Sequence, residues 1–137
     1  MQLIIRHFPN VFLLLNGLIY LFLAYLFLTD ATSWFTRLGI SPSKEVGFTE
    51  LRTMYLGLMF AIGIFVIISS GIRSFQFPGL LFLLISYAFL GLVRGYGIFV
   101  EDASNQLMVN LFLAEFSSTI LAACALICSV KNSSGRR

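Results

Sequence analysis

Four long apolar runs alternate with shorter polar stretches along the chain. They cover about residues 10–29, 52–72, 77–99 and 107–130. Each run is close to the ~20 residues that an α-helix needs to cross the hydrocarbon core of a bilayer. The runs lack the alternation of apolar and polar positions that is typical of strands, and a transmembrane barrel needs at least about eight alternating segments. The pattern therefore predicts an all-α protein with four transmembrane helices.

The connections between the runs predict how the helices are arranged. Residues 73–76 and 101–106 are short links, and short links place consecutive helices side by side and antiparallel. Residues 30–50 form a longer link, whose first half is amphipathic and contains Trp34 and Phe35. We expect this half to lie in the membrane interface, with Trp34 as an anchor. The prediction is one integral membrane domain over residues 1–137, an antiparallel up-down four-helix bundle with a short interfacial segment between spans 1 and 2.

The composition supports a membrane protein and excludes several other classes. Hydrophobic residues make up 58% of the 137 residues and charged residues 11%, whereas a soluble domain has about 45–50% and about 25%. A chain this short cannot bury so much apolar surface in a soluble globule. The nine basic residues are scattered and form no stripe with aromatic residues, so nucleic acid is not an expected partner. The expected partner is the lipid bilayer.

The distribution of basic residues predicts the orientation of the chain. With four spans, both termini lie on one face of the membrane, together with five basic residues and no acidic ones: Arg6, Arg73, Lys131, Arg136 and Arg137. On the other face, only Arg37 and Lys44 are basic residues of the loops. Because positively charged loops stay in the cytoplasm, both termini are expected there. The opposite face is called the outer face.

Ionisable residues inside the apolar runs are the main candidates for function, because they are costly in a bilayer. Arg94 lies roughly 24 Å along the third run from its inner end, and Glu115 lies roughly 12 Å below the outer end of the fourth. Arg52 begins the second run at the outer face. All three therefore belong to the outer half. We expect Glu115 to pair with Arg94, or with Arg52 as the second choice.

Two interpretations of this polar cluster remain open. A buried ion pair can serve only to fix the order of the helices. Alternatively, the polar residues line a cavity that opens to the outer face and binds a lipid head group, a quinone or another amphiphile. Classical catalytic chemistry is not expected, because His7 is the single histidine and no serine or cysteine has a histidine base available. No metal site is expected, because His7 has no second histidine and no thiolate partner outside the membrane.

Two stretches of the chain resemble an uncharacterised family of small bacterial four-span membrane proteins that is distantly DoxX-like. The stretch TELRTMYLG, residues 49–57, resembles the Glu-x-Arg-x-x-Tyr-Gly-Gly signature of that family, with Leu56 in place of the first glycine. The stretch LGLVRG, residues 90–95, resembles its glycine and arginine pattern late in the third span, and Glu115 its acidic residue in the fourth. The resemblance implies a location in the bacterial inner membrane and a polar cluster of Glu50, Arg52, Tyr55, Arg94 and Glu115.

The resemblance implies no single activity. DoxX-like relatives include subunits of quinone-linked oxidoreductases and membrane assembly factors. The leading hypothesis is a non-enzymatic accessory or assembly subunit that binds a membrane-protein partner or lipid through the polar cluster, within a larger membrane complex or a homo-oligomer. One alternative is a membrane subunit of a quinone- or lipid-linked oxidoreductase. Another is a small proton-coupled transporter that uses Glu115. No cofactor is expected, although a quinone or a lipid could occupy the cluster.

Overall fold

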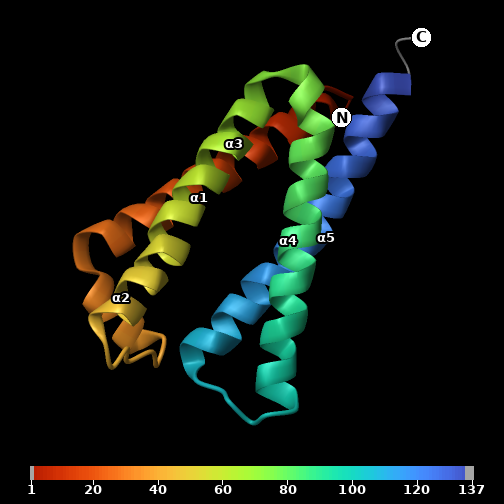
Figure 1. Ribbon diagram of the computed structural model, residues 1–137. Coiled ribbons are helices and arrows are strands. Elements are labelled where there is room, and N and C mark those ends of the chain that lie inside the picture. Colours follow the sequence, from red (N-terminus) through yellow and green to blue (C-terminus); the bar gives the residue numbers. More distant parts are fainter. Residues whose placement is uncertain (1, 135–137) are drawn as a thin grey trace. The chain divides into compact units, whose positions relative to one another are not determined.

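The computed structural model describes residues 2–134, and the side chains of residues 7–131. The described chain is all-α, as predicted (Figure 1). Its elements are α1 (Gln2–Arg37), α2 (Glu45–Arg52), η1 (Thr53–Leu58), α3 (Met59–Gly71), α4 (Arg73–Phe99) and α5 (Gln106–Ser134). The segment η1 is a π-helix, and α2, η1 and α3 follow one another without a break.

Four helical stretches are long and apolar enough to cross a membrane: His7–Arg37, Glu45–Gly71, Arg73–Phe99 and Gln106–Lys131. They confirm the four predicted spans and make the chain a small multi-pass membrane protein. Their bounds differ from those expected from hydropathy. The first helix continues past residue 29, the second begins at Glu45, and the turn expected at residues 73–76 is helical, so that Ile72 alone separates α3 from α4.

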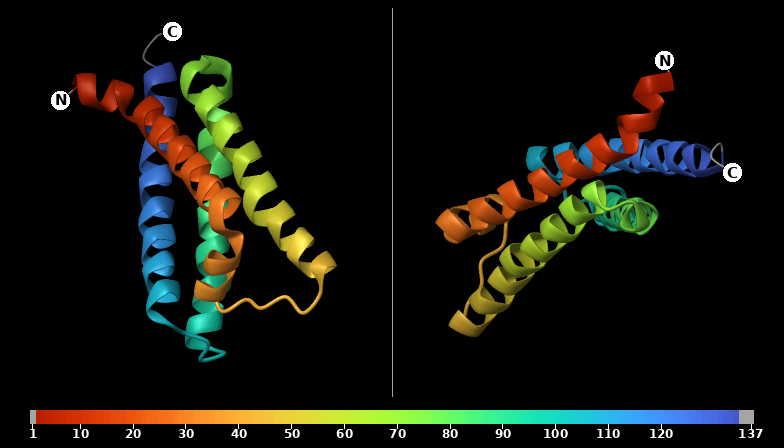
Figure 2. Two further views of the ribbon diagram at one scale, coloured as in Figure 1. Left: turned by 90° about the vertical axis from the view of Figure 1, so that its left-hand side faces the viewer. Right: turned by 90° about the horizontal axis from the view of Figure 1, so that it is seen from above.

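The contacts divide the chain into two compact units, each described by itself. Unit 1 comprises Met1–Leu13 and Ser69–Arg137, and unit 2 comprises Leu14–Ile68. In unit 1, α4 and α5 lie side by side and run in opposite directions (Figures 1 and 2). Its core contains residues with no exposed surface from three helices: Leu13, Leu80, Leu83, Ala122 and Ala125. A single membrane domain over the whole chain stays a prediction.

A chain of polar contacts links four helices at one end of unit 1. The Asn10 amide on α1 donates to the backbone carbonyl of Ser70 at 2.8 Å. The Gln76 amide on α4 donates to the side-chain oxygen of Asn10, and the Ser129 hydroxyl on α5 donates to Gln76 Oε1 at 3.3 Å. The opposite end, where residues 100–105 connect α4 to α5, is called the outer end of unit 1.

Unit 2 is a pair of helices joined by residues 38–44. The first helix breaks at Asp30, whose backbone is not helical (φ −151°, ψ 68°). The Asp30 carboxylate accepts a hydrogen bond from the Ser33 amide at 3.1 Å, which is the geometry of a residue that caps a new helix. Residues 31–37 are therefore a separate helical stretch, in the place where the sequence predicts a short segment between spans 1 and 2.

The side chain of Phe35 is buried in the protein. Its position beside Trp34 at the outer interface stays a prediction, but the side chain is only 1% exposed and does not face lipid. It lies in a core cluster with Phe27 and Ala31, and its ring packs edge-on against that of Tyr55 at 5.5 Å. The reason is the restart of the helix at Asp30, which turns this part of the chain onto the second helix. Trp34 remains half-buried.

Candidate functional site

Arg94 and Glu115 form a two-pronged ion pair between α4 and α5. Arg94 Nε donates to Glu115 Oε2 at 2.9 Å, and Arg94 Nη2 donates to Glu115 Oε1 at 2.8 Å. Side-chain exposure is 22% for Arg94 and 10% for Glu115. Paired, parallel hydrogen bonds between a guanidinium and a carboxylate are among the strongest polar contacts in proteins. The predicted pairing of Glu115 with Arg94 is confirmed.

The directions of the two helices explain why these side chains meet. Arg94 lies five residues before the end of α4, roughly 7.5 Å below it, and Glu115 lies nine residues after the start of α5, roughly 13.5 Å below it. Side chains on a helix tilt toward its N-terminus. The Arg94 side chain therefore tilts inward and that of Glu115 tilts toward the outer end, so the two converge from different depths.

Glycine residues on α4 let α5 approach closely at this level. A Cβ atom on Gly95 would lie 3.0 Å from Phe112 Cε2, which is closer than ordinary contact. A Cβ atom on Gly91 would lie 3.8 Å from Glu115 Cβ. Small residues at such crossings are typical of helix packing in membranes. The Phe112 ring thus rests on the backbone of α4 just above the ion pair.

The guanidinium of Arg94 has donors that these contacts do not use. It carries five N–H groups. Two of them bind Glu115, and a third, on Nη1, points to Met108 Sδ at 3.0 Å. Met108 was not predicted from the sequence, although its position two turns before Glu115 places both on one face of α5. Two N–H groups of Arg94 have no acceptor among the described residues.

The backbone of Glu115 is also tied into this region. Its carbonyl oxygen accepts a hydrogen bond from the Thr119 hydroxyl at 2.8 Å. The Glu115 residue is 8% exposed. Within the described residues, every buried side-chain nitrogen or oxygen has a hydrogen-bond partner. This satisfies the requirement for polar groups surrounded by hydrocarbon.

The other three predicted cluster residues belong to unit 2. Glu50 is exposed on α2, and the Arg52 guanidinium carbon lies 5.9 Å from the centre of the Phe48 ring. Tyr55 stacks obliquely on Phe27, with ring centres 4.8 Å apart. Whether these three residues join Arg94 and Glu115 in one cluster stays a prediction, since the two units are described separately.

Tyr55 lies within the π-helix η1, in the stretch that resembles the family signature. A π-helix adds one residue to each turn and shifts the side chains that follow it to a new face. Here the wide turn coincides with the contact of Tyr55 with Phe27 and Phe35 in the core cluster. Tyr55 therefore has a packing role in unit 2.

Among the described residues, no group of three or more His, Cys, Asp or Glu side chains is placed to hold a metal ion. Cys124 and Cys128 are free thiols on α5. The ion pair that the structure describes in unit 1 is that of Arg94 with Glu115.

Comparison with known proteins assigns no family to the chain. It matches no protein-family model, no curated protein sequence and no solved structure. The resemblance to DoxX-like proteins stays a prediction. The function has to be inferred from the geometry of the site itself.

Proposed function

We propose that this membrane protein is a non-enzymatic accessory or assembly subunit. Arg94 binds an acceptor group of a membrane-protein partner or a lipid. Glu115 holds the guanidinium in place and neutralises its charge. The acceptor would be a backbone carbonyl, a carboxylate or a phosphate oxygen that reaches the outer end of unit 1.

One observation carries the proposal: Arg94 has two unused N–H groups although Glu115 and Met108 fix its guanidinium. Placing an N–H group without a hydrogen-bond acceptor in the hydrocarbon of a bilayer costs about several kcal/mol of free energy. The 22% exposure of the Arg94 side chain leaves room for an acceptor to reach it. A guanidinium already held in one orientation loses little conformational entropy when it binds.

The surface beside Arg94 suits a membrane partner. Leu92 and Val93, which directly precede Arg94 on α4, are 67% and 72% exposed, and Tyr96, two residues after it, is 57% exposed. In a membrane, such a surface is covered by acyl chains or by another helix. An arginine at the edge of an apolar helix face can give specificity to either contact.

The geometry argues against proton-coupled transport through Glu115. Both of its carboxylate oxygens accept hydrogen bonds from Arg94. A carboxylate that exchanges protons during transport would first have to leave this partner. Removing one partner of a buried pair typically costs about 3–5 kcal/mol, so each transport cycle would have to supply that energy.

We also propose that the protein lies in a bacterial inner membrane with both termini in the cytoplasm. The support is the distribution of basic residues along the chain. Arg73 and Lys131 are exposed at helix ends in unit 1. Arg136, Arg137 and the side chain of Arg6 lie outside the described residues, so their contribution rests on the sequence.

Affinity purification tests the proposed role. The tagged protein is purified in a mild detergent, and co-purifying proteins and lipids are identified by mass spectrometry. The test variant combines Arg94→Leu with Glu115→Leu, which removes the whole ion pair and leaves no unpaired charge. The matched control is Arg73→Leu, an exposed arginine at the other end of α4.

The proposal predicts a partner protein or a lipid species that is enriched with the wild type and with Arg73→Leu and is lost from the folded double variant. The same set of proteins and lipids on all three would contradict it. A bound quinone lost only from the double variant would favour the oxidoreductase subunit instead.

A further inference from the structure

A second candidate site lies in unit 2, where the chain passes from α1 to α2. An open pocket of about 470 Å³ is present there. It is lined by Thr32, Phe35, Thr36, Ile40, Ser41, Pro42, Ser43, Lys44, Glu45 and Phe48.

Local backbone signals shape this pocket. Gly39 adopts φ +74°, a left-handed conformation that glycine tolerates best. The Ile40 amide then donates back to the Phe35 carbonyl at 2.8 Å and the Gly39 amide to that of Thr36 at 3.0 Å, which is the usual way to close a helix with glycine. After this turn the chain continues as a loop to Lys44, which has an extended backbone and directly precedes α2.

Aromatic rings form the base of the pocket. The Phe35 and Phe48 rings lie edge to face, with centres 5.6 Å apart and planes at 87°. Phe35 belongs to the core cluster of unit 2, so the base is rigid. The half-buried Phe48 ring provides contact surface for the carbon atoms of a ligand, and the buried Phe35 ring supports it from below.

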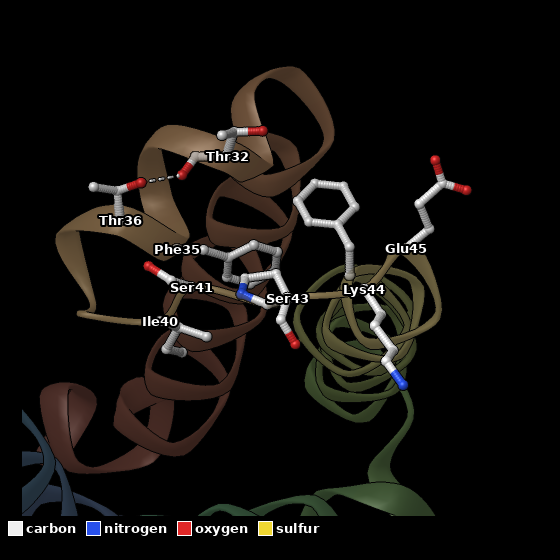
Figure 3. Close-up of a pocket in the computed structure, with 10 residues that line it drawn as sticks. Thr32, Phe35, Thr36, Ile40, Ser41, Ser43, Lys44 and Glu45 are labelled. Atoms are coloured by element: carbon white, nitrogen blue, oxygen red, sulfur yellow. Dashed lines mark hydrogen bonds between the residues drawn. The ribbon is translucent and has the colours of Figure 1, made fainter.

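The polar lining divides between the two helix ends (Figure 3). In that view, Thr32, Thr36 and Ser41 lie on the α1 side, Lys44 and Glu45 extend from the α2 side, and Ser43 lies between them. The Thr36 hydroxyl already donates to the Thr32 carbonyl at 2.9 Å, so its remaining capacity is to accept. The α1 side thus offers hydroxyl groups, while the α2 side offers one positive and one negative charge.

The pocket also lies at a level where lipid head groups are expected. It joins the ends of two helices that are long and apolar enough to span the membrane. Trp34 is half-buried in the preceding turns, and the Arg37 guanidinium carbon lies 5.0 Å from its ring centre. Tryptophan and arginine together are typical of the membrane–water interface.

From these observations we infer that the pocket binds a zwitterionic phospholipid head group, with phosphoethanolamine as the simplest chemistry. Lys44 and the hydroxyl of Ser43 donate to the phosphate. Glu45 accepts from the ammonium group. The side chains of Lys44 and Glu45 are both exposed and long enough to turn toward the ligand. The inference is independent of the role proposed for Arg94, because the pocket lies in unit 2.

Native mass spectrometry of the full-length protein tests this inference. Phosphatidylethanolamine and phosphatidylglycerol are added separately, and soluble O-phosphoethanolamine in a third series. The variants are Lys44→Gln and Glu45→Gln. The charge-matched controls are Lys131→Gln and Glu101→Gln, which are exposed residues of unit 1.

The wild type and both controls should bind phosphatidylethanolamine more tightly than phosphatidylglycerol. Each pocket variant should lose about tenfold in affinity for phosphatidylethanolamine, as expected for one charge-assisted contact. Circular dichroism should show the same helix content for all variants, since the altered residues are exposed.

Three results would overturn the inference. Equal affinity for both lipids, unchanged by Glu45→Gln, would exclude recognition of the ammonium group. Unchanged affinity of Lys44→Gln would exclude the pocket as the phosphate site. Binding of soluble phosphoethanolamine as tightly as the lipid would show that a small soluble molecule, not a membrane lipid, is the ligand.

Discussion

Arg94 and Glu115 approach one another from different depths of two antiparallel helices and join through two hydrogen bonds of 2.9 and 2.8 Å. A lone arginine near a helix end normally extends toward the interface, where water solvates its charge. Here the guanidinium points toward the carboxylate of α5. The ion pair therefore fixes both the spacing and the register of α4 and α5 near the outer end of unit 1.

The close approach of α4 and α5 predicts that Gly95 cannot be enlarged. A Cβ atom at this position lies 3.0 Å from the Phe112 ring, whereas one on Gly97 has only Glu101 Oε2 within 4 Å, at 3.9 Å. Gly95→Leu should destabilise the protein by about 1–3 kcal/mol through overpacking. Gly97→Leu is the control. Thermal unfolding in detergent should show a clearly lower midpoint for the first variant alone, and equal midpoints would contradict the packing described for Phe112.

The break at Asp30 predicts a local effect of removing its carboxylate. Asp30→Ala leaves the Ser33 amide without its acceptor, so the first turn of residues 31–37 should open more readily. Hydrogen exchange at Ser33 should become roughly fivefold faster, as expected for the loss of one helix cap. Asp30→Asn retains a capping oxygen and should exchange at nearly the wild-type rate. The capping role would be wrong if the alanine variant exchanged no faster than the asparagine variant.

Trp34 provides a direct probe of membrane depth. It is the single tryptophan of the chain and is half-buried next to Arg37. Because an indole ring favours the head-group level of a bilayer, its fluorescence should be quenched most strongly by lipids brominated near the head group. Strongest quenching by lipids brominated at the ends of the acyl chains would contradict the interfacial position.

The predicted orientation can be tested by cysteine labelling in intact cells. Both native cysteines are first replaced by alanine, and single cysteines are then introduced at Lys131 or at Ser43. An impermeant thiol reagent should label Ser43→Cys and leave Lys131→Cys unlabelled, because the positive-inside rule places the termini in the cytoplasm. The reverse pattern would show that the protein is inserted the other way round.

The helices and the ion pair could be predicted from the sequence, because both follow from counting residues along apolar runs that cross a bilayer. About twenty apolar residues fix a span, and counting residues from the ends of two antiparallel spans places Arg94 and Glu115 within reach of each other. Hydropathy does not report where a helix ends. The stretch that begins at Glu45 is polar, so hydropathy predicts a loop where the structure has a helix. The first helix continues to Arg37, because the chain resumes helical structure after the break at Asp30.

The pocket and the burial of Phe35 could not be predicted in the same way. Both depend on how two distant segments fold against each other, which no local pattern reports. Phe35 becomes a core residue because Phe27, Phe48 and Tyr55 surround it. Lys44 contributes to the sequence analysis only as a loop charge for orientation.

A double-mutant cycle on the ion pair tests the central claim most directly. Arg94→Leu and Glu115→Leu are made singly and together, and the free energy of unfolding is measured in one detergent. Each single variant leaves an uncompensated charge and should lose about 3–5 kcal/mol. The double variant should lose much less than the sum of the two. A double variant whose loss equals that sum would show that Arg94 and Glu115 do not act together, and would contradict the account.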